Sequence, residues 1–298
     1  MNRRGFLKAC LAGAGAAAGF GRLSGASTGE KPAEETKRKA VLKLGSQEGR
    51  LPGETLKEKV ENLQKYGGVG LEIGAGGLPG RIKEIKHALT RTKVVVSAIC
   101  AAAGPYIIPD EGARRKAMDS AKMLLSAAAE LGATGVIMVP AFNGAQDQLT
   151  GKPARDLLLR VLAELGEHGA KAGSRVLIEP LNRNEAFFLR QLADAASICR
   201  DANSPGVAMM GDLYHMYIEE TSDMGAFVSA GGYLHHVHMA SRTRVLPGQD
   251  DGSFVDAFRG LKMIGYRGFC SLECGCNGDP AVEIPKSFRF LEKQWENA

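Results

Sequence analysis

Short apolar runs alternate with longer stretches of helical periodicity along residues 39–298, and this alternation predicts an α/β fold, a (β/α)8 TIM barrel. Eight such strand–helix units follow one another without a break. The strands are continuous apolar runs, which is typical of parallel strands covered on both faces. A doubly wound open sheet would carry a glycine fingerprint after its first strand. The segment LKLGSQEGR lacks one, and Pro79 stands where the final glycine belongs after the second strand, so the closed barrel is favoured.

The chain begins with a basic segment that we interpret as an export signal. Residues 1–26 hold four positive charges and no acid, and Arg3 and Arg4 precede a weakly hydrophobic, glycine-rich run. That run is too short to span a bilayer stably. The pattern resembles a twin-arginine signal peptide, which predicts an exported, periplasmic protein. Residues 27–38 are polar and charged without apolar periodicity, and we expect them to form a linker ahead of a single barrel at 39–298.

The four charges of this signal account for most of the formal net charge of +5, so the rest of the chain is nearly neutral. A nearly neutral body gives no electrostatic reason to expect a nucleic-acid partner. We therefore expect a small molecule as the partner, with no nucleic acid and no stable membrane span.

The first half of the barrel is expected to contain four strands with helices between them. The strands are expected at Ala40–Gly45, Val69–Gly74, Lys93–Ala101 and Gly135–Phe142. The clearest helices are expected at Glu54–Gly67, Glu111–Ala133 and Ala154–Gly173, and Gly173 suits a C-cap. The glycine-rich stretch Gly74–Gly80 is interpreted as a loop over the mouth of the barrel.

The second half repeats the pattern, and each of its four strands ends in a residue that can bind a metal. These residues are Glu179, Asp212, His238 and Glu273. Active sites of such barrels lie at the carboxyl ends of the strands, so the four side chains are expected to converge. Helices are expected at Leu189–Ala202, Asp223–Ala230 and Ser253–Gly265, and Glu283–Ala298 closes the chain.

Three carboxylates and one imidazole form an oxygen-rich ligand set. Such a set suits Mn²⁺, Mg²⁺, Co²⁺ or Zn²⁺, and the oxygen majority favours Mn²⁺ or Mg²⁺. His236 shares a strand face with His238, because side chains alternate along a strand. We expect His236 to lie beneath the metal ligand and to support it by hydrogen bonding. His235 points the opposite way and is expected to pack against a helix.

The spacing of these residues resembles that of a known family. The motifs are Glu179, Asp212-Leu-Tyr-His215, His236-Val-His238 and Glu273, after the fifth, sixth, seventh and eighth strands. This pattern is similar to that of the xylose isomerase-like barrel superfamily, in particular the tagatose and psicose 3-epimerases and the hydroxypyruvate isomerases. The resemblance is close from IEPLNRNE to CSLEC and faint before that stretch.

The resemblance implies roles for individual residues. It implies that Glu179, Asp212, His238 and Glu273 hold the metal, and that Glu179 and Glu273 also act as the acid/base pair. Glu185, His215 and Arg244 match groups that contact the substrate. Glu72, at the end of the second strand, is the one further candidate for a sugar contact in the first half. The resemblance also implies a sugar substrate and a homo-oligomer.

The chemistry of such a reaction explains these residue types. Moving a proton between carbons of a hydroxy-ketone requires removal of a weakly acidic C–H, and a divalent metal stabilises the developing enediolate. Two carboxylates on opposite faces can take and return the proton. Return to the other face gives an epimer, and return to the neighbouring carbon gives an aldose or ketose isomer. The sequence leaves this choice open.

Other functions fit the same pattern. An exported member could act as a lyase or hydrolase on keto-glycosides, and a hydroxypyruvate isomerase-like enzyme would use the same site. A non-catalytic sugar-binding barrel would not need both Glu179 and Glu273. An endonuclease for abasic DNA needs extra histidines after the second and third strands, where this chain offers Glu72 and Cys100.

Overall fold

The computed structural model describes residues 39–102, 104–144 and 149–298. The expected export signal at 1–26 and linker at 27–38 lie outside these described residues, so both stay predictions. No helix in the described part of the chain is long and apolar enough to cross a lipid bilayer.

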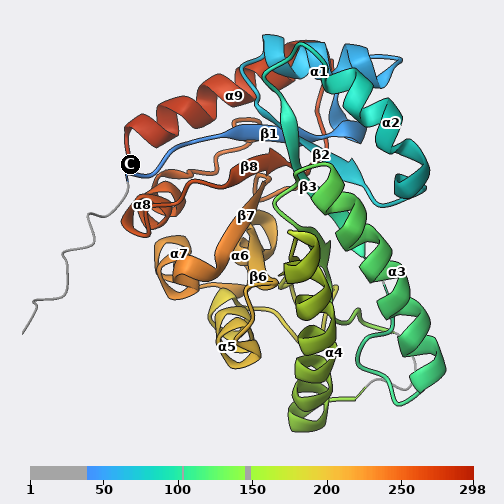
Figure 1. Cartoon of the computed structure of the whole chain (residues 1–298). Helices are drawn as coiled ribbons and strands as arrows, with labels where there is room; N and C mark the ends of the chain where they lie inside the picture. The colour runs from blue at the N-terminus through green and yellow to red at the C-terminus, as the bar shows by residue number, and fades with distance from the viewer. Residues whose placement is uncertain (1–38, 103, 145–148) are drawn as a thin grey trace, which may run out of the picture. The chain divides into compact units, whose positions relative to one another are not determined.

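Eight parallel strands close into one barrel, with each strand paired to its neighbours in chain order (Figure 1). The strands are β1 (Leu44–Gln47), β2 (Gly70–Gly74), β3 (Val95–Ala102), β4 (Val136–Met138), β5 (Val176–Ile178), β6 (Val207–Asp212), β7 (Leu234–Met239) and β8 (Phe269–Leu272). The barrel closes where β1 pairs with β8, from Leu44 opposite Cys270 to Ser46 opposite Leu272. The predicted (β/α)8 barrel is therefore confirmed.

Helices connect the strands and lie outside them (Figure 1). They are α1 (Leu56–Lys65), α2 (Leu78–Leu89), α3 (Glu111–Glu130), α4 (Gly151–Ala172), α5 (Leu192–Ala202), α6 (Leu213–Glu219), α7 (Asp223–Ala230), α8 (Val255–Met263) and α9 (Pro280–Glu296), with short 3-10 helices at Glu48–Arg50 and Gly231–Tyr233. Capping residues in the local sequence determine where several of these helices begin or end. Thr55 and Glu58 form a capping box at the start of α1, and Gly173 ends α4 with φ of 88°, as expected from its position.

The alternation of side chains along each strand separates two kinds of core. On β5, Val176 and Ile178 pack outward into the layer between strands and helices, whereas Leu177 points into the barrel. The barrel interior is filled by a small apolar cluster of Ala98, Ile137, Leu177, Ala208 and Met210. Glu179 is two residues beyond Leu177, so the same alternation turns its carboxylate inward.

Three local expectations differ from the structure. The first strand begins at Leu44 rather than Ala40 and continues to Gln47. The stretch expected as a mouth loop already contains the first turn of α2, because Pro79 suits the first turn of a helix. A short helix, α6, follows β6 directly and was not expected; Asp212 caps it by accepting a hydrogen bond from Tyr214 N.

Candidate metal-dependent active site

The four expected metal ligands converge at the carboxyl end of the barrel. The potential ligand atoms of Glu179, Asp212, His238 and Glu273 all lie within 4.8 Å of one another. Nδ1 of His238 lies 3.1 Å from Glu273 Oε2, and 3.8 Å from both Glu179 Oε1 and Asp212 Oδ2. The side chains of His238 and Asp212 are fully buried, and that of Glu273 is 17% exposed. The ends of β5 to β8 therefore form one compact pocket of acids around a single imidazole.

The electrostatics of this group fit a divalent cation. Burial and the neighbouring acids raise the pKa of Glu179 well above its usual value, although His238 opposes the shift. Burial likewise raises the pKa of Asp212 to about 7, against the effects of Arg244 and His238. Nδ1 of His238 is buried and has no hydrogen-bond partner among the described residues. A divalent ion would accept this nitrogen lone pair and neutralise the crowded carboxylates, so the donor set is chemically suitable.

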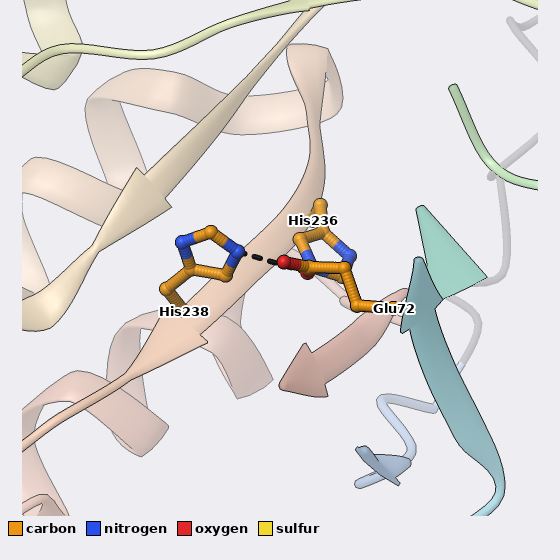
Figure 2. A group of neighbouring side chains, drawn as sticks. All are labelled: Glu72, His236 and His238. Carbon is orange, nitrogen blue, oxygen red and sulfur yellow. Dashed lines mark hydrogen bonds and ion pairs between the residues drawn. The ribbon is translucent and has the colours of Figure 1, made fainter. Parts of the chain in front are cut away.

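A buried carboxylate fixes the imidazole from the opposite side. Figure 2 shows Glu72 reaching from β2 toward the two imidazoles of β7. Its Oε2 lies 2.7 Å from Nε2 of His236 and 2.9 Å from Nε2 of His238. A carboxylate that pairs with Nε2 leaves Nδ1 of His238 to face the acids, which is the arrangement that a metal-binding histidine requires. His236 thus lies beside the expected ligand and shares its carboxylate.

The electrostatic environment keeps Glu72 ionised. Burial alone would raise its pKa, but His238 and His236 outweigh this and lower the pKa to about 2. The Glu72 side chain is fully buried. The expectation that Glu72 contacts substrate stays a prediction, and its observed contacts are with the two histidines and with Gln47.

Gln47 is a site residue that the sequence analysis missed. Its amide nitrogen donates to Glu72 Oε1 at 2.8 Å and to Glu273 Oε1 at 2.7 Å. Gln47 therefore bridges Glu72, which supports the histidines, and Glu273, which is a candidate metal ligand. The signal was available in the pattern of the strand, because Gln47 lies two residues beyond Gly45 on the same face, but the first strand was expected to end at Gly45.

Arg244 bridges two acids of the group. Its Nη1 donates to Asp212 Oδ2 at 2.9 Å, and its Nη2 donates to Glu273 Oε2 at 2.6 Å. The guanidinium also stacks 4.6 Å above the ring of Tyr214. The backbone of Arg244 has φ of 60°, a conformation that few side chains adopt. The expected substrate-binding arginine is thus in direct contact with two expected metal ligands.

His215 and Glu185, the other expected substrate contacts, lie on the same side of the site. His215 comes from α6, and its Nε2 lies 3.4 Å from Arg244 Nη1 and 3.8 Å from Asp212 Oδ2. Burial and the charge of Arg244 lower the pKa of His215 to about 3. Glu185 is 46% exposed, and its Oε1 lies 3.8 Å from His215 Nδ1. The structure thus brings every expected site residue to one end of the barrel.

The loop that carries Glu185 is held by two acids at the C-terminal end of α6, the buried Glu219 and the half-buried Glu220. Glu219, at the end of α6, accepts hydrogen bonds from the backbone and the side chain of Arg183, both at 2.7 Å. Glu220 accepts a hydrogen bond from the backbone of Leu192 at 2.7 Å. These contacts hold Arg183 and Leu192, near the two ends of the β5–α5 loop, against the end of α6. The orientation of Glu185 in this loop therefore depends on the position of α6, which also carries His215.

Cys100 lies beside the acids of the site, whereas His235 lies on the other face of β7. Sγ of Cys100 lies 3.9 Å from Glu273 Oε1, and burial and the charge of Glu72 raise the pKa of this thiol far above its usual value. Cys100 is therefore a neutral thiol beside the carboxylates. His235 points away from the site, as expected, and its ring contacts Arg175 Nη1 at 2.9 Å.

Comparison with known proteins identifies the family. Residues 60–294 match the model of the xylose isomerase-like TIM barrel family. The chain is 28% identical over 262 residues to 3-dehydro-D-guloside 4-epimerase of Escherichia coli (strain K12), over 84% of this chain and 99% of that protein. It is 26% identical over 245 residues to fructoselysine 3-epimerase of Escherichia coli O157:H7, over 75% of this chain and 86% of that protein.

Solved structures agree with this assignment. The crystal structure of 3-keto-D-glucoside 4-epimerase from E. coli matches with a TM-score of 0.77 and 28% identity, over 85% of this chain and 100% of that chain. D-psicose 3-epimerase from Clostridium cellulolyticum H10, solved with D-tagatose, matches with a TM-score of 0.71 and shares the fold at 21% identity, over 86% of this chain and 96% of that chain. The chain is therefore a member of the xylose isomerase-like TIM barrel family.

Proposed function

We propose that the protein is a divalent-metal-dependent epimerase that inverts a carbon next to the ketone of a keto-sugar. The observation that carries this proposal is the convergence of Glu179, Asp212, His238 and Glu273 within 4.8 Å at the active end of the barrel. Three of these four residues are carboxylates, and the two glutamates, Glu179 and Glu273, are the ones that would exchange protons with carbon.

The four residues would hold a single divalent ion, with Mn²⁺ or Mg²⁺ favoured by the three oxygen ligands. When bound, the ion would polarise the ketone and stabilise negative charge on the neighbouring oxygens. Nδ1 of His238 would be its nitrogen ligand, because Nε2 already pairs with Glu72. Glu72, His236 and Gln47 would keep this ligand and Glu273 in place.

The proton transfer itself is assigned to Glu179 and Glu273. One carboxylate removes the C–H proton beside the ketone, and the electron pair of that bond moves into the enediolate. The second, in its acid form, returns a proton to the opposite face of the same carbon, so the product is the epimer and no external oxidant or reductant is needed. The two groups then exchange their protonation states through solvent before the next turnover in the same direction.

Three side chains would bind the oxygens of the sugar. Arg244 and His215 carry donors that face Asp212, where oxygen atoms of the substrate would lie. Glu185, which is half exposed, would accept a hydrogen bond from a sugar hydroxyl. Hydrogen-bond donors placed where charge develops contribute directly to the rate of such a reaction.

A glycoside with a keto group in its ring is the substrate class best supported. The E. coli relative whose name specifies a 3-dehydro-guloside and inversion at carbon 4 matches over 99% of its length. The D-psicose 3-epimerase of Ruminiclostridium cellulolyticum matches at 31% identity over 38% of its length. We therefore place 3-keto-glycosides ahead of free ketoses.

Proton NMR in heavy water tests the proposal. The protein loaded with Mn²⁺ or Mg²⁺ would be incubated with 3-keto-glycosides and free ketoses, with a chelator-treated sample as the control, and the metal would be removed before spectra are recorded. We expect loss of the signal of one C–H beside the ketone, together with the inverted product, in the loaded sample alone. Elimination or hydrolysis products would instead identify a lyase or hydrolase, and no exchange with any compound would favour a non-catalytic sugar-binding protein.

We also infer, from residues 1–26 alone, that the protein is exported to the periplasm by the twin-arginine route. Replacement of Arg3 and Arg4 by lysine is expected to leave the precursor in the cytoplasm, because that route depends on the arginine pair. Fractionation of cells and N-terminal sequencing of the periplasmic form would check both the route and the cleavage site. An unchanged distribution in the variant would contradict this inference.

A further inference from the structure

Asn182 has no role so far in the proposed mechanism. It lies at the centre of a small network of hydrogen bonds. It is completely buried in the β5–α5 loop, three residues after Glu179. Its side-chain nitrogen lies 2.7 Å from Nδ1 of His215 and 3.0 Å from Oε1 of Glu185. Its backbone N–H also points at Nδ1 of His215, at 3.3 Å. One asparagine therefore contacts both side chains expected to bind substrate on this side of the site.

Neighbours with fixed hydrogen-bonding roles decide which way the amide of Asn182 faces. The backbone N–H of Asn184 can only donate, and it lies 2.9 Å from Oδ1 of Asn182. Oε1 of Glu185 accepts a hydrogen bond from Nδ2 at 3.0 Å. Reversing the amide would set a donor against a donor and an acceptor against an acceptor, so Nδ2 is the atom that faces His215.

The orientation of the amide decides the tautomer of His215. Nδ1 is approached by two N–H donors, one from the side chain and one from the backbone of Asn182, so it must accept and cannot carry a proton. A neutral imidazole then carries its proton on Nε2. Nε2 is the nitrogen that faces the active site, 3.8 Å from Asp212 Oδ2.

The contact of His215 with Arg244 would favour the other tautomer, and the distances decide against it. Nη1 of Arg244 lies 3.4 Å from Nε2 of His215 and only 2.9 Å from Asp212 Oδ2, so its stronger hydrogen bond goes to the carboxylate and its contact with His215 is at the long limit for a hydrogen bond. The contacts at Nδ1 are shorter, and one of them comes from a backbone N–H whose role cannot change. His215 and Arg244 are therefore two donors that face the same acceptor position.

We propose that Asn182 is a positioning residue that holds His215 in the Nε2-protonated tautomer, so that His215 binds a substrate oxygen as a neutral hydrogen-bond donor. The tautomer follows from the contacts alone, whereas its effect on catalysis rests on the proposed epimerase function. In that reaction the oxygen next to the reacting carbon gains negative charge, and a donor already aimed at it stabilises that charge. His215 in this state donates a hydrogen bond and takes no part in carrying the proton between Glu179 and Glu273.

Nitrogen-15 NMR of the full chain with labelled histidine measures the tautomer without any substrate. The His215→Gln variant assigns the His215 signals among the six histidines. We expect the Nδ1 shift of an unprotonated nitrogen and the Nε2 shift of a protonated one. In Asn182→Asp, the new carboxylate can only accept, and at the 2.7 Å of the present side-chain contact it should outweigh the backbone N–H at 3.3 Å, so Nδ1 should become protonated. Asn184→Asp makes the same change of charge at an exposed side chain two residues away and should leave the His215 signals unchanged.

Kinetics of the same variants test the catalytic consequence. Asn182→Asp is expected to lower kcat by ~10²-fold with a much smaller change in KM, because the oxygen donor is lost mainly in the transition state. Asn184→Asp should stay close to the wild-type protein in both constants. An equal loss in both variants would indicate a general effect of charge and would overturn the positioning role.

The spectra separate the failure of this inference from the failure of the proposed function. A wild-type spectrum with a protonated Nδ1 overturns the inference, and this result needs no variant to fold. An Asn182→Asp spectrum identical to that of the wild type overturns it as well. The expected spectra combined with no epimerisation by the wild-type protein would support the positioning role while removing the proposed reaction.

Discussion

The two halves of the barrel supply the site in different ways. Strands β5 to β8 end in groups that can bind a metal or move a proton, and each of them points into the group directly. Strands β1 to β3 contribute Gln47, Glu72 and Cys100, and these residues contact the ligands from beside or beneath. Under the proposed function, the second half of the barrel would perform the chemistry, whereas the first half would fix the orientation of the groups that perform it.

The buried polar groups of the first half are stabilised by the groups of the second half that they support. Glu72 is a fully buried carboxylate, which would be strongly destabilising without partners. Its partners are the two imidazoles of β7, which the closure of the barrel brings to it from 164 and 166 residues away in the chain. The folding of the closed barrel thus keeps Glu72 and the two imidazoles in contact and maintains the geometry of the site.

The largest effect is expected from the two carboxylates of the second half. Glu179→Gln and Glu273→Gln each remove a group that carries a proton, so epimerisation should fall by ~10³-fold or more. The fold should remain, because each replacement keeps the size of the side chain, and circular dichroism would confirm this. Glu84→Gln on the exposed face of α2 serves as the control. Activity within tenfold of the wild type in either site variant would contradict the two-carboxylate mechanism.

Removal of the metal should abolish activity without removing any side chain. Treatment with a chelator is expected to stop epimerisation, and addition of Mn²⁺ or Mg²⁺ should restore it. The loaded protein should also unfold at a higher temperature, since a ligand at 100 times its Kd stabilises the folded state by about 2.7 kcal/mol. Calorimetry of both forms would measure this shift. Full activity in a sample that elemental analysis shows to be free of metal would contradict the assignment.

A smaller effect is expected from the supporting carboxylate of the first half. Glu72→Gln keeps the shape of the side chain but weakens its hold on His238, so the affinity for the metal should fall by roughly 10–100-fold. The kcat measured at saturating metal should fall less, because the groups that carry the proton are unchanged. Titration calorimetry with Mn²⁺ would measure the affinity. A loss of kcat as large as that of Glu179→Gln at saturating metal would show that the first half takes part in the chemistry itself.

The smallest effect is expected from an acid in the first half that lies outside the ligand group. Burial would raise the pKa of Glu48, but hydrogen bonds from Arg81 and from the backbone of Gly74 outweigh it and lower the pKa. The unfolded chain therefore binds the proton more tightly, and the stabilisation is present above pH 4.5 and is lost as the pH falls through the folded-state pKa.

Glu48→Gln should lower the free energy of unfolding by about 1–2 kcal/mol at neutral pH, and the difference from the wild type should shrink in acid. Urea unfolding at a series of pH values measures this difference, and the exposed Glu61→Gln in α1 is a control for the loss of one charge. A difference that stays constant down to acid pH would show that the Glu48–Arg81 pair does not contribute through ionisation.

The convergence of four side chains could be predicted from the sequence because strand ends are marked by local pattern. Glu179, Asp212, His238 and Glu273 each follow an apolar run, and a closed barrel aligns such positions at one end. Residues whose role depends on contacts across the chain were not predicted. Asn182 reaches His215 across 33 residues, and no periodicity marks which polar residue of the loop will do so.

Gln47 was missed for a different reason. Its strand was expected to begin four residues earlier and to end at Gly45, so Gln47 lay outside the expected strand. The boundary depends on pairing with β2 and β8, and those partners are distant in the chain. Strand ends that are fixed by pairing cannot be located from composition alone.

The position of a bound Mn²⁺ ion tests the central claim most directly. Crystals of the Mn²⁺-loaded protein would give an anomalous signal that locates the ion without reference to any assumed ligand. The account predicts one ion within roughly 2.0–2.3 Å of Nδ1 of His238 and of carboxylate oxygens from Glu179, Asp212 and Glu273. An ion held instead by Glu72, Cys100 and Glu273, which also lie within 4.8 Å of one another, would contradict the division between the two halves of the barrel.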